Sequence, residues 1–234
     1  MRTPRIERMR ERYFNTIPSI TSERLVLATE AYQKFAGDAV PVFRAKVVKY
    51  IMERMTTLIF DDELIVGTAT NAYRGANLHP EFQSSSWYLS DLDEFSTRSK
   101  DPYYISPEDK EIIRKTLPYW EGKSMEDYAD QVMPAYIQEL EADDVLCVGL
   151  ENGVSGETTC DHEKILRVGL RGYIKECKRN IANTLPQTKE EAAKVDFWNA
   201  CIIQCEGLIT YAHRMAEEAL RLANECKDEQ RKQE

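Results

Sequence analysis

The chain has 234 residues, and 42% of them are hydrophobic, which is enough for a packed core. Its 31 basic and 40 acidic residues give a net charge of −9, so nothing in the composition favours binding to nucleic acid or to an anionic membrane surface. No apolar run approaches the roughly 18 residues that a membrane span requires. The charged N-terminus is not followed by an apolar segment, and we therefore expect a cytoplasmic protein.

Residues of about 4–56 carry the patterns of three helices. Apolar side chains occur at helical spacing over residues 4–15, with charged side chains on the other face. Gly37 closes the second helix, and Pro41 suits the first turn of a third, which runs to about Met55. The second and third helices are expected to lie antiparallel.

A long polar loop is predicted over residues 61–87. Near its start, Leu64–Val66 contains two β-branched residues and is too short for a helix, so we predict a strand there. Loops of this length are usually functional or disordered, and the aromatic residues Tyr73, Phe82 and Trp87 favour an ordered, docked loop. Packing does not require its polar and turn-forming residues, which are Arg74, Gly75, His79, Pro80 and Glu81.

Further helices are predicted over about residues 106–143. Ser106 is followed by a proline and two acids, which is typical of a capped helix start. Ser124 with Asp127 opens another short helix, and residues 134–143 continue the helical pattern.

The last part of the chain combines a second polar loop with long helices. Val145–Val148 is predicted as a strand, residues 149–162 as a glycine-bearing loop, and residues 163–227 as long helices. Thr188 and Glu191 form a capping box for the last helix. The apolar stripe expected to pack along it is Val195, Trp198, Ile202, Cys205, Ile209, Ala212, Ala216, Ala219, Ala223 and Cys226.

The six cysteines form no CxxC pair, and we interpret them as reduced. Cys201 and Cys205 could share a metal ion with His213, but their place on a helix favours packing, and no metal site is predicted. His213 is expected at the helix surface. No GxxxxGK[ST], HExxH, GxSxG or dinucleotide fingerprint occurs, and no catalytic residue is predicted.

Five ordered segments, within about Arg5 to Lys227, resemble the N-terminal part of the glycyl radical enzymes, in their dehydratase and lyase branch. The segments are SITSERLVLATEAYQ, VPVFRAKVVKYIMER, IFDDELIVGTATNAYRGANLHPEF, DPYYISPEDKEIIRKTLPYWEGKS and DHEKILRVGLRGYIKE. The resemblance implies a mainly α fold with a few short strands. It also implies that residues 1–234 are the N-terminal helical part of a ten-stranded α/β barrel.

The cysteine loop and the radical loop of that family are missing from this sequence. Arg167-Val168-Gly169 with Gly172-Tyr173 only mimics the radical loop, because the spacing differs and Gly169 is expected inside a helix. The chain alone is therefore expected to be inactive and to bind no cofactor.

The resemblance also implies the chemistry and the partners of the complete enzyme. An activating enzyme that uses S-adenosylmethionine and an iron–sulfur cluster would install a glycyl radical in the missing C-terminal part. A C–O, C–N or C–C bond of a small polar substrate would then be cleaved, in a homodimeric enzyme of an anaerobe.

Glu157 is the one candidate substrate-binding residue. The resemblance places it where relatives carry a polar side chain that contacts substrate, a histidine in the diol dehydratases and an aspartate in the choline lyase. A carboxylate there could accept a hydrogen bond from a hydroxyl group or pair with a cation. The alternative is that Glu157 is a solvated acid near a helix N-terminus.

Two other functions remain open from the sequence. The chain could be a self-contained helical interaction module, or a small-molecule binding module that uses its two polar loops. A contiguous exposed apolar face would favour a portion of a longer enzyme over both, because monomers seldom leave such faces open.

Overall fold

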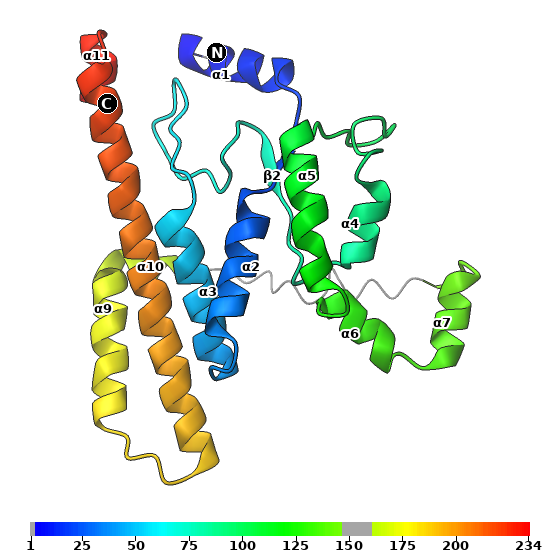
Figure 1. The fold of residues 1–234 in the computed structure, drawn as a ribbon. Helices are drawn as coiled ribbons and strands as arrows, with labels where there is room; N and C mark the ends of the chain where they lie inside the picture. Colours follow the sequence, from blue (N-terminus) through cyan, green and yellow to red (C-terminus); the bar gives the residue numbers. More distant parts are fainter. Residues whose placement is uncertain (1–2, 147–160) are drawn as a thin grey trace. The chain divides into compact units, whose positions relative to one another are not determined.

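The structure is a computed structural model that describes residues 3–146 and 161–234. It is 64% helical, which confirms the expected mainly α class (Figure 1). The chain divides into two compact units. Of the described residues, 3–16, 26–74 and 161–234 form unit 1, and 17–25 and 75–146 form unit 2.

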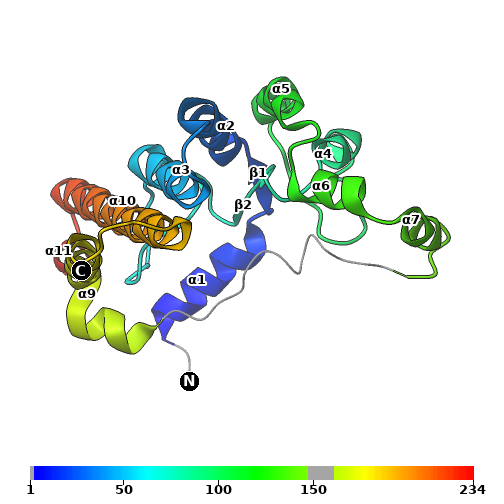
Figure 2. The same ribbon diagram turned by 90° about the horizontal axis from the view of Figure 1, so that it is seen from below.

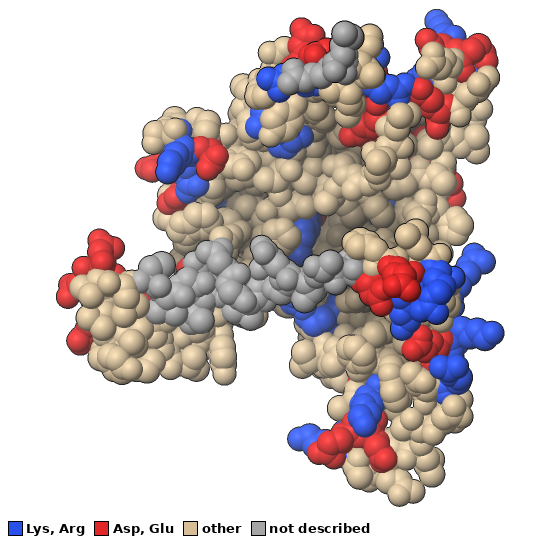
Figure 3. Space-filling view, turned by 180° about the vertical axis from the view of Figure 1, so that it is seen from behind, with Lys and Arg blue, Asp and Glu red and all other residues tan. Residues whose placement is uncertain are grey.

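Unit 1 is built from helices, and the start of the longest one carries the expected cap. Glu191 N donates to Thr188 Oγ1 at 3.2 Å, so the predicted capping box is present. Basic side chains, with acidic ones among them, lie on the surface of the helix that follows residue 161, as Figure 3 shows. The helices of this unit are α1 (Pro4–Asn15), most of α2 (Glu23–Phe35), α3 (Val40–Arg54), α9 (His162–Ala182), α10 (Lys189–Glu225) and α11 (Glu229–Gln233).

The long helix α10 is the centre of unit 1, because it packs against both α3 and α9 (Figures 1 and 2). It lies close to α3 at Gly207, where an added Cβ would lie 2.9 Å from Lys49 Cα. Arg214 then donates to the carbonyls of Met52 and Met55 at 2.8 and 2.7 Å. These bonds satisfy carbonyl groups at the C-terminal end of α3.

The predicted stripe on α10 is half-buried in its first half and again at Ala223 and Cys226, and the prediction is wrong for the three alanines in between. Ala200, Gly207 and Met215 are the buried residues, whereas Ala212, Ala216 and Ala219 are exposed. The packed face shifts because a glycine allows the close approach to α3, and because Arg214 and Tyr211 make polar contacts on that side. The spacing of apolar residues in the sequence contains no signal of either effect.

Gly169 was expected inside a regular helix, and this is wrong. Its φ of 64° and ψ of 173° break α9 into two helical parts. Glycine reaches positive φ without the steric cost of a Cβ, so it permits the kink. None of the helices in the described ranges combines the length and apolar composition needed to cross a bilayer.

Unit 2 contains two short strands that the sequence did not reveal. β1 (Ser19–Thr21) and β2 (Gly75–Asn77) pair in parallel, with Ile20 opposite Ala76. Ile20 N also donates to Tyr104 O at 2.9 Å. The helical elements of this unit are α4 (Ser85–Asp91), α5 (Pro107–Thr116), the 3-10 helix η1 (Leu117–Trp120), α6 (Met125–Val132) and α7 (Ala135–Ala142).

The core of unit 2 lies where α4, α5 and η1 meet the strands. Its buried side chains include Ile20, Leu78, Leu92, Phe95, Ile105, Ile113, Leu117 and Trp120. The predicted cap at Ser106 is confirmed, since Ser106 Oγ accepts from Asp109 N at 3.0 Å. Asp109 also accepts from Ser22 N at 3.0 Å, and so joins α5 to the end of β1.

The strand predicted at Leu64–Val66 is wrong. These residues form bends and irregular backbone, and Ile65 is 93% exposed. A β-branched run needs a neighbouring strand to form a ladder, and unit 1 as described contains none. Of the strand predicted at Val145–Val148, residues 145–146 are irregular and residues 147–148 lie outside the described residues.

Candidate functional site

The predicted site residue Glu157 and most of the loop 149–162 lie outside the described residues. The described edge of this segment is the start of α9. There Asp161 Oδ1 accepts a hydrogen bond from Lys164 N at 3.0 Å, which caps the helix.

Within the loop predicted over residues 61–87, residues 61–74 belong to unit 1 and are ordered and docked there, as expected. The rings of Phe60 and Tyr73 meet edge to face at 4.9 Å, and Tyr211 of α10 donates to Thr68 O at 2.7 Å. Arg231 donates to the carbonyls of Phe60 and Glu63 at 3.3 and 2.8 Å. Residues far apart in sequence therefore fix the backbone of this loop.

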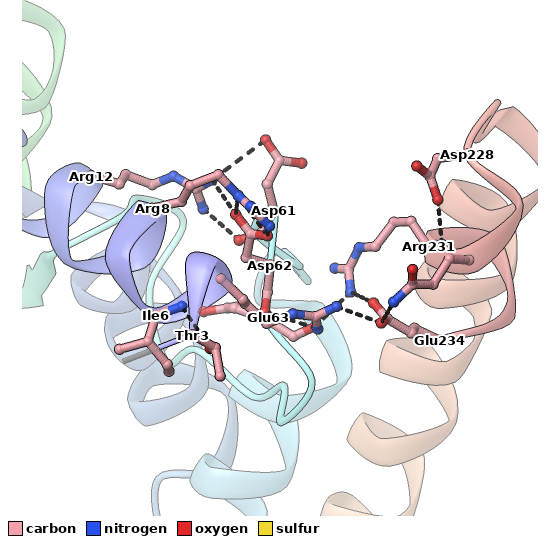
Figure 4. Close-up of polar contacts among 12 residues, drawn as sticks. Thr3, Ile6, Arg8, Arg12, Asp61, Asp62, Glu63, Asp228, Arg231 and Glu234 are labelled. Atoms are coloured by element: carbon pink, nitrogen blue, oxygen red, sulfur yellow. Dashed lines mark hydrogen bonds and ion pairs between the residues drawn. The ribbon is translucent and has the colours of Figure 1, made fainter. Parts of the chain in front are cut away.

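An arginine–carboxylate cluster joins α1, the start of this loop and α11 (Figure 4). It consists of Arg5, Arg8, Arg12, Asp61, Asp62, Arg231 and Glu234. Arg8 pairs with Asp62 and donates hydrogen bonds that hold the pKa of this carboxyl below its usual value. Arg12 donates to Asp61 O at 2.6 Å.

The cluster positions elements and offers little chemistry of its own. Its carboxylates are already paired with guanidinium groups, which cannot give up a proton near neutral pH. Such exposed pairs add little stability, because solvent screens their charges. The geometry therefore supports a role in holding α1 against the loop.

A buried polar network in unit 2 contains the loop residues His79 and Glu81. Arg24 donates to both carboxylate oxygens of Glu81, at 3.1 Å for Oε2, and to Leu78 O at 3.1 Å. Burial opposes ionisation of Glu81, but the hydrogen bonds and charge of Arg24 prevail, so its pKa lies below the usual value. Glu81 is only 8% exposed, and this ion pair is therefore shielded from water.

His79 and Tyr88 complete this network. Burial first, and then the charge of Arg24, lowers the pKa of His79, which favours the neutral imidazole. Burial raises the pKa of Tyr88 to about 12, and its hydroxyl donates to Gln83. Because both oxygens of Glu81 are engaged by Arg24, the network is suited to hold the loop and not to attack a substrate.

Sequence reasoning found His79 and Glu81 as residues that packing does not need, but it missed their partner Arg24. Arg24 lies 57 residues before Glu81, at the polar start of an otherwise apolar helix. Its only local signal is a cation in a first turn, where the helix dipole does not favour one.

The cysteines that the structure describes, Cys177, Cys201, Cys205 and Cys226, have free thiols. Cys205 and Cys226 are half-buried, and His213 is exposed on α10 as expected. Within residues 3–146 and 161–234, no group of side chains is arranged to hold a metal ion.

Comparison with known proteins gives one consistent result. The family model described as "Pyruvate formate lyase-like" matches residues 1–234. Indoleacetate decarboxylase of Tractidigestivibacter scatoligenes is 32% identical over 263 residues, covering 99% of this chain and 30% of that protein. Trans-4-hydroxy-L-proline dehydratase of Clostridioides difficile is 29% identical, covering 98% of this chain and 29% of that protein.

Solved structures agree with these relatives. The B12-independent glycerol dehydratase of Clostridium butyricum, in its glycerol-bound form, superposes with a TM-score of 0.93 at 33% identity. That match covers 99% of this chain and 30% of the dehydratase. The chain thus spans less than a third of the length of the relatives that it matches.

Proposed function

Because the chain belongs to the pyruvate formate-lyase-like family of glycyl radical enzymes, we propose that it is the N-terminal portion of such an enzyme, of the dehydratase or lyase branch. Complete, that enzyme cleaves a C–O, C–N or C–C bond of a small polar substrate. Alone, the chain is inactive.

One observation carries this proposal: the family model matches the whole of this chain, but the chain covers only part of its relatives. The chain matches the family from its first residue to its last, yet it covers only 30% of the glycerol dehydratase at a TM-score of 0.93. A self-contained module would be expected to share its length with its relatives. The proposal therefore assigns the catalytic cysteine and the radical glycine to the remaining part of the enzyme.

This chain then contributes supporting helices and the residues that line one side of the site. The glycyl radical in the remaining part supplies a hydrogen-abstracting centre once an activating enzyme with S-adenosylmethionine and an iron–sulfur cluster has installed it. We assign to this chain the helices that hold the polar loops. The complete enzyme is proposed to be a cytoplasmic homodimer of an anaerobe.

Neither glycine of the radical-like motif fits a radical site. Gly169 lies at the kink of α9, and Gly172 lies within the helix beside Val168. We therefore expect that incubating this chain with a matched activating enzyme gives no glycyl doublet in electron paramagnetic resonance. A doublet that isotopic labelling assigns to Gly169 or Gly172 would overturn the proposal.

Glu157 is proposed as a residue that contacts substrate. Support comes from the resemblance of its segment to those of the relatives, and from the chemistry of a carboxylate in a water-poor pocket, which can accept a hydroxyl hydrogen bond. Glutamate in place of the histidine of the diol dehydratases argues against glycerol or propanediol as the substrate.

The test of Glu157 needs the complete enzyme. Glu157→Gln should keep the fold and the radical yield but lower kcat/KM by about tenfold or more, the value of one charge-assisted hydrogen bond. Glu163→Gln, at an exposed position in the first turn of α9, is the matched control and should leave kcat/KM unchanged. Equal kinetics for wild type and Glu157→Gln would remove Glu157 from the site.

A further inference from the structure

Helix α1 is attached to unit 1 through its polar side. Arg8 and Arg12 bind the Asp61–Asp62 turn, and Arg5 pairs with Glu234. Helix α1 contains no buried residue. Its attachment is therefore mainly ionic, whereas an amphipathic helix normally buries its apolar stripe.

Most of the apolar side of α1 faces solvent, although Met9 is half-buried and the guanidinium carbon of Arg74 lies 4.1 Å from the centre of the Tyr13 ring. Ile6, Tyr13 and Phe14 are 47%, 48% and 63% exposed. They recur at the spacing of one helix face, with Arg10 between them and its guanidinium carbon 4.6 Å from the centre of the Phe14 ring. Among the described residues, Arg10 has no carboxylate at ion-pair distance.

The ionic contacts fix which way this face points. Turning Ile6 and Phe14 toward unit 1 would require α1 to rotate about its axis and would break the pairs of Arg8 and Arg12 with Asp62. Arg74 adds a further restraint, since it donates to Tyr13 O at 3.0 Å and to Thr16 O at 2.7 Å. The outward direction is thus a property of the docked helix.

We propose that Ile6, Arg10, Tyr13 and Phe14 form an internal docking face for the polypeptide that follows residue 234 in the complete protein. The covering surface is apolar and carries a carboxylate opposite Arg10. This inference rests on the proposed function, because it requires the longer chain. A second observation supports it: the chain spans only about 30% of the length of its relatives.

The size of the face favours this occupant over a second copy of the chain. Three partly exposed side chains of this kind present on the order of 300–400 Å², which is well below the roughly 800 Å² per partner of a stable protein–protein interface. A contact within one polypeptide avoids the entropy cost of association, so a small apolar face is sufficient.

Hydroxyl-radical footprinting tests the proposal. The complete gene product, without its glycyl radical, is compared with residues 1–234 alone. The oxidation rates of Tyr13 and Phe14 should be at least about tenfold lower in the complete protein. Equal rates would overturn this inference and leave the proposed function intact. Protection already present in residues 1–234 would overturn it too, because the face would then be covered within this chain.

A matched pair of variants gives a second, independent readout. Phe14→Asp and Asn15→Asp both place a carboxylate in the last turn of α1, with the same unfavourable interaction with the helix dipole. In the complete protein, Phe14→Asp should lower the melting temperature by several degrees more than Asn15→Asp. In residues 1–234 alone, the two variants should differ much less, because Phe14→Asp there removes only the contacts of the ring with Arg10 and Tyr13. Equal shifts in the complete protein would contradict the docking face.

A gene product that ends at residue 234 would contradict both the proposed function and this inference.

Discussion

At the scale of single residues, the ion pair of Arg24 and Glu81 shows how a buried charge is retained. Both carboxylate oxygens of Glu81 accept hydrogen bonds from Arg24, and a third bond from the guanidinium reaches Leu78 O. Removing one partner of such a pair costs about 3–5 kcal/mol, because the other charge stays buried without compensation. The pair therefore ties the start of α2 to the loop through the backbone of Leu78 and the side chain of Glu81.

His79 makes the stability of this region dependent on pH. Its pKa lies below the ordinary value of 6.5, because burial and Arg24 disfavour the imidazolium. The unfolded chain then binds the proton more tightly, so stability falls as the pH drops below 6.5. The contribution of Glu81 is present above its ordinary value of 4.5 and is lost as the pH falls through its lowered pKa.

We predict that His79→Gln reduces the pH dependence of unfolding. The urea midpoint of the wild type should be lower at about pH 5.5 than at about pH 7.5, and the variant should show a smaller difference. His213→Gln, at the exposed histidine of α10, is the control and should keep the wild-type difference. The same pH difference in wild type and His79→Gln would show that His79 does not titrate in this network.

The residue scale is where the sequence predicted least. It marked His79 and Glu81 as residues without a packing role, but an ion pair between residues 57 positions apart has no local signature. The same holds for Arg214, whose bonds to the end of α3 depend on tertiary contact. Glu157 stays a prediction.

At the scale of elements, the helix starts were the most predictable features, because their determinants are local. The caps at Ser106, Ser124 and Thr188 are present, and the last two form capping boxes. Strands depend on distant partners. Leu64–Val66 has strand-like residues and no partner, whereas β2 is Gly75–Asn77, which has little strand propensity and pairs with β1.

We predict that Gly207→Ala destabilises unit 1, although alanine is the better helix former. An added Cβ would lie 2.9 Å from Lys49 Cα and 3.1 Å from its Cβ, so α3 and α10 would have to separate. The expected net loss is about 1–2 kcal/mol in chemical unfolding, since overpacking exceeds the gain of about 1 kcal/mol in helix propensity.

Ala212→Gly is the control that measures the effect of helix propensity alone. Ala212 is exposed on the same helix, so the substitution should cost about 1 kcal/mol through propensity alone. If Gly207→Ala instead stabilised unit 1 by about 1 kcal/mol, the backbone and side chain of Lys49 would not restrict this position.

At the scale of the whole molecule, the resemblance of ordered segments predicted more than periodicity could. Hydrophobic patterning indicates a mainly helical chain but cannot name the enzyme to which the helices belong. The match over residues 1–234 and the coverage of about 30% of the relatives agree with the resemblance. The exposed apolar side of α1 is the surface that we propose the missing length covers.

The most direct test of the central claim is the intact mass of the protein as its source organism makes it. The account predicts a polypeptide about three times as long as residues 1–234, judged from the 30% coverage of the glycerol dehydratase. A mass of 27.1 kDa, with no separate polypeptide that copurifies and completes the family length, would contradict it.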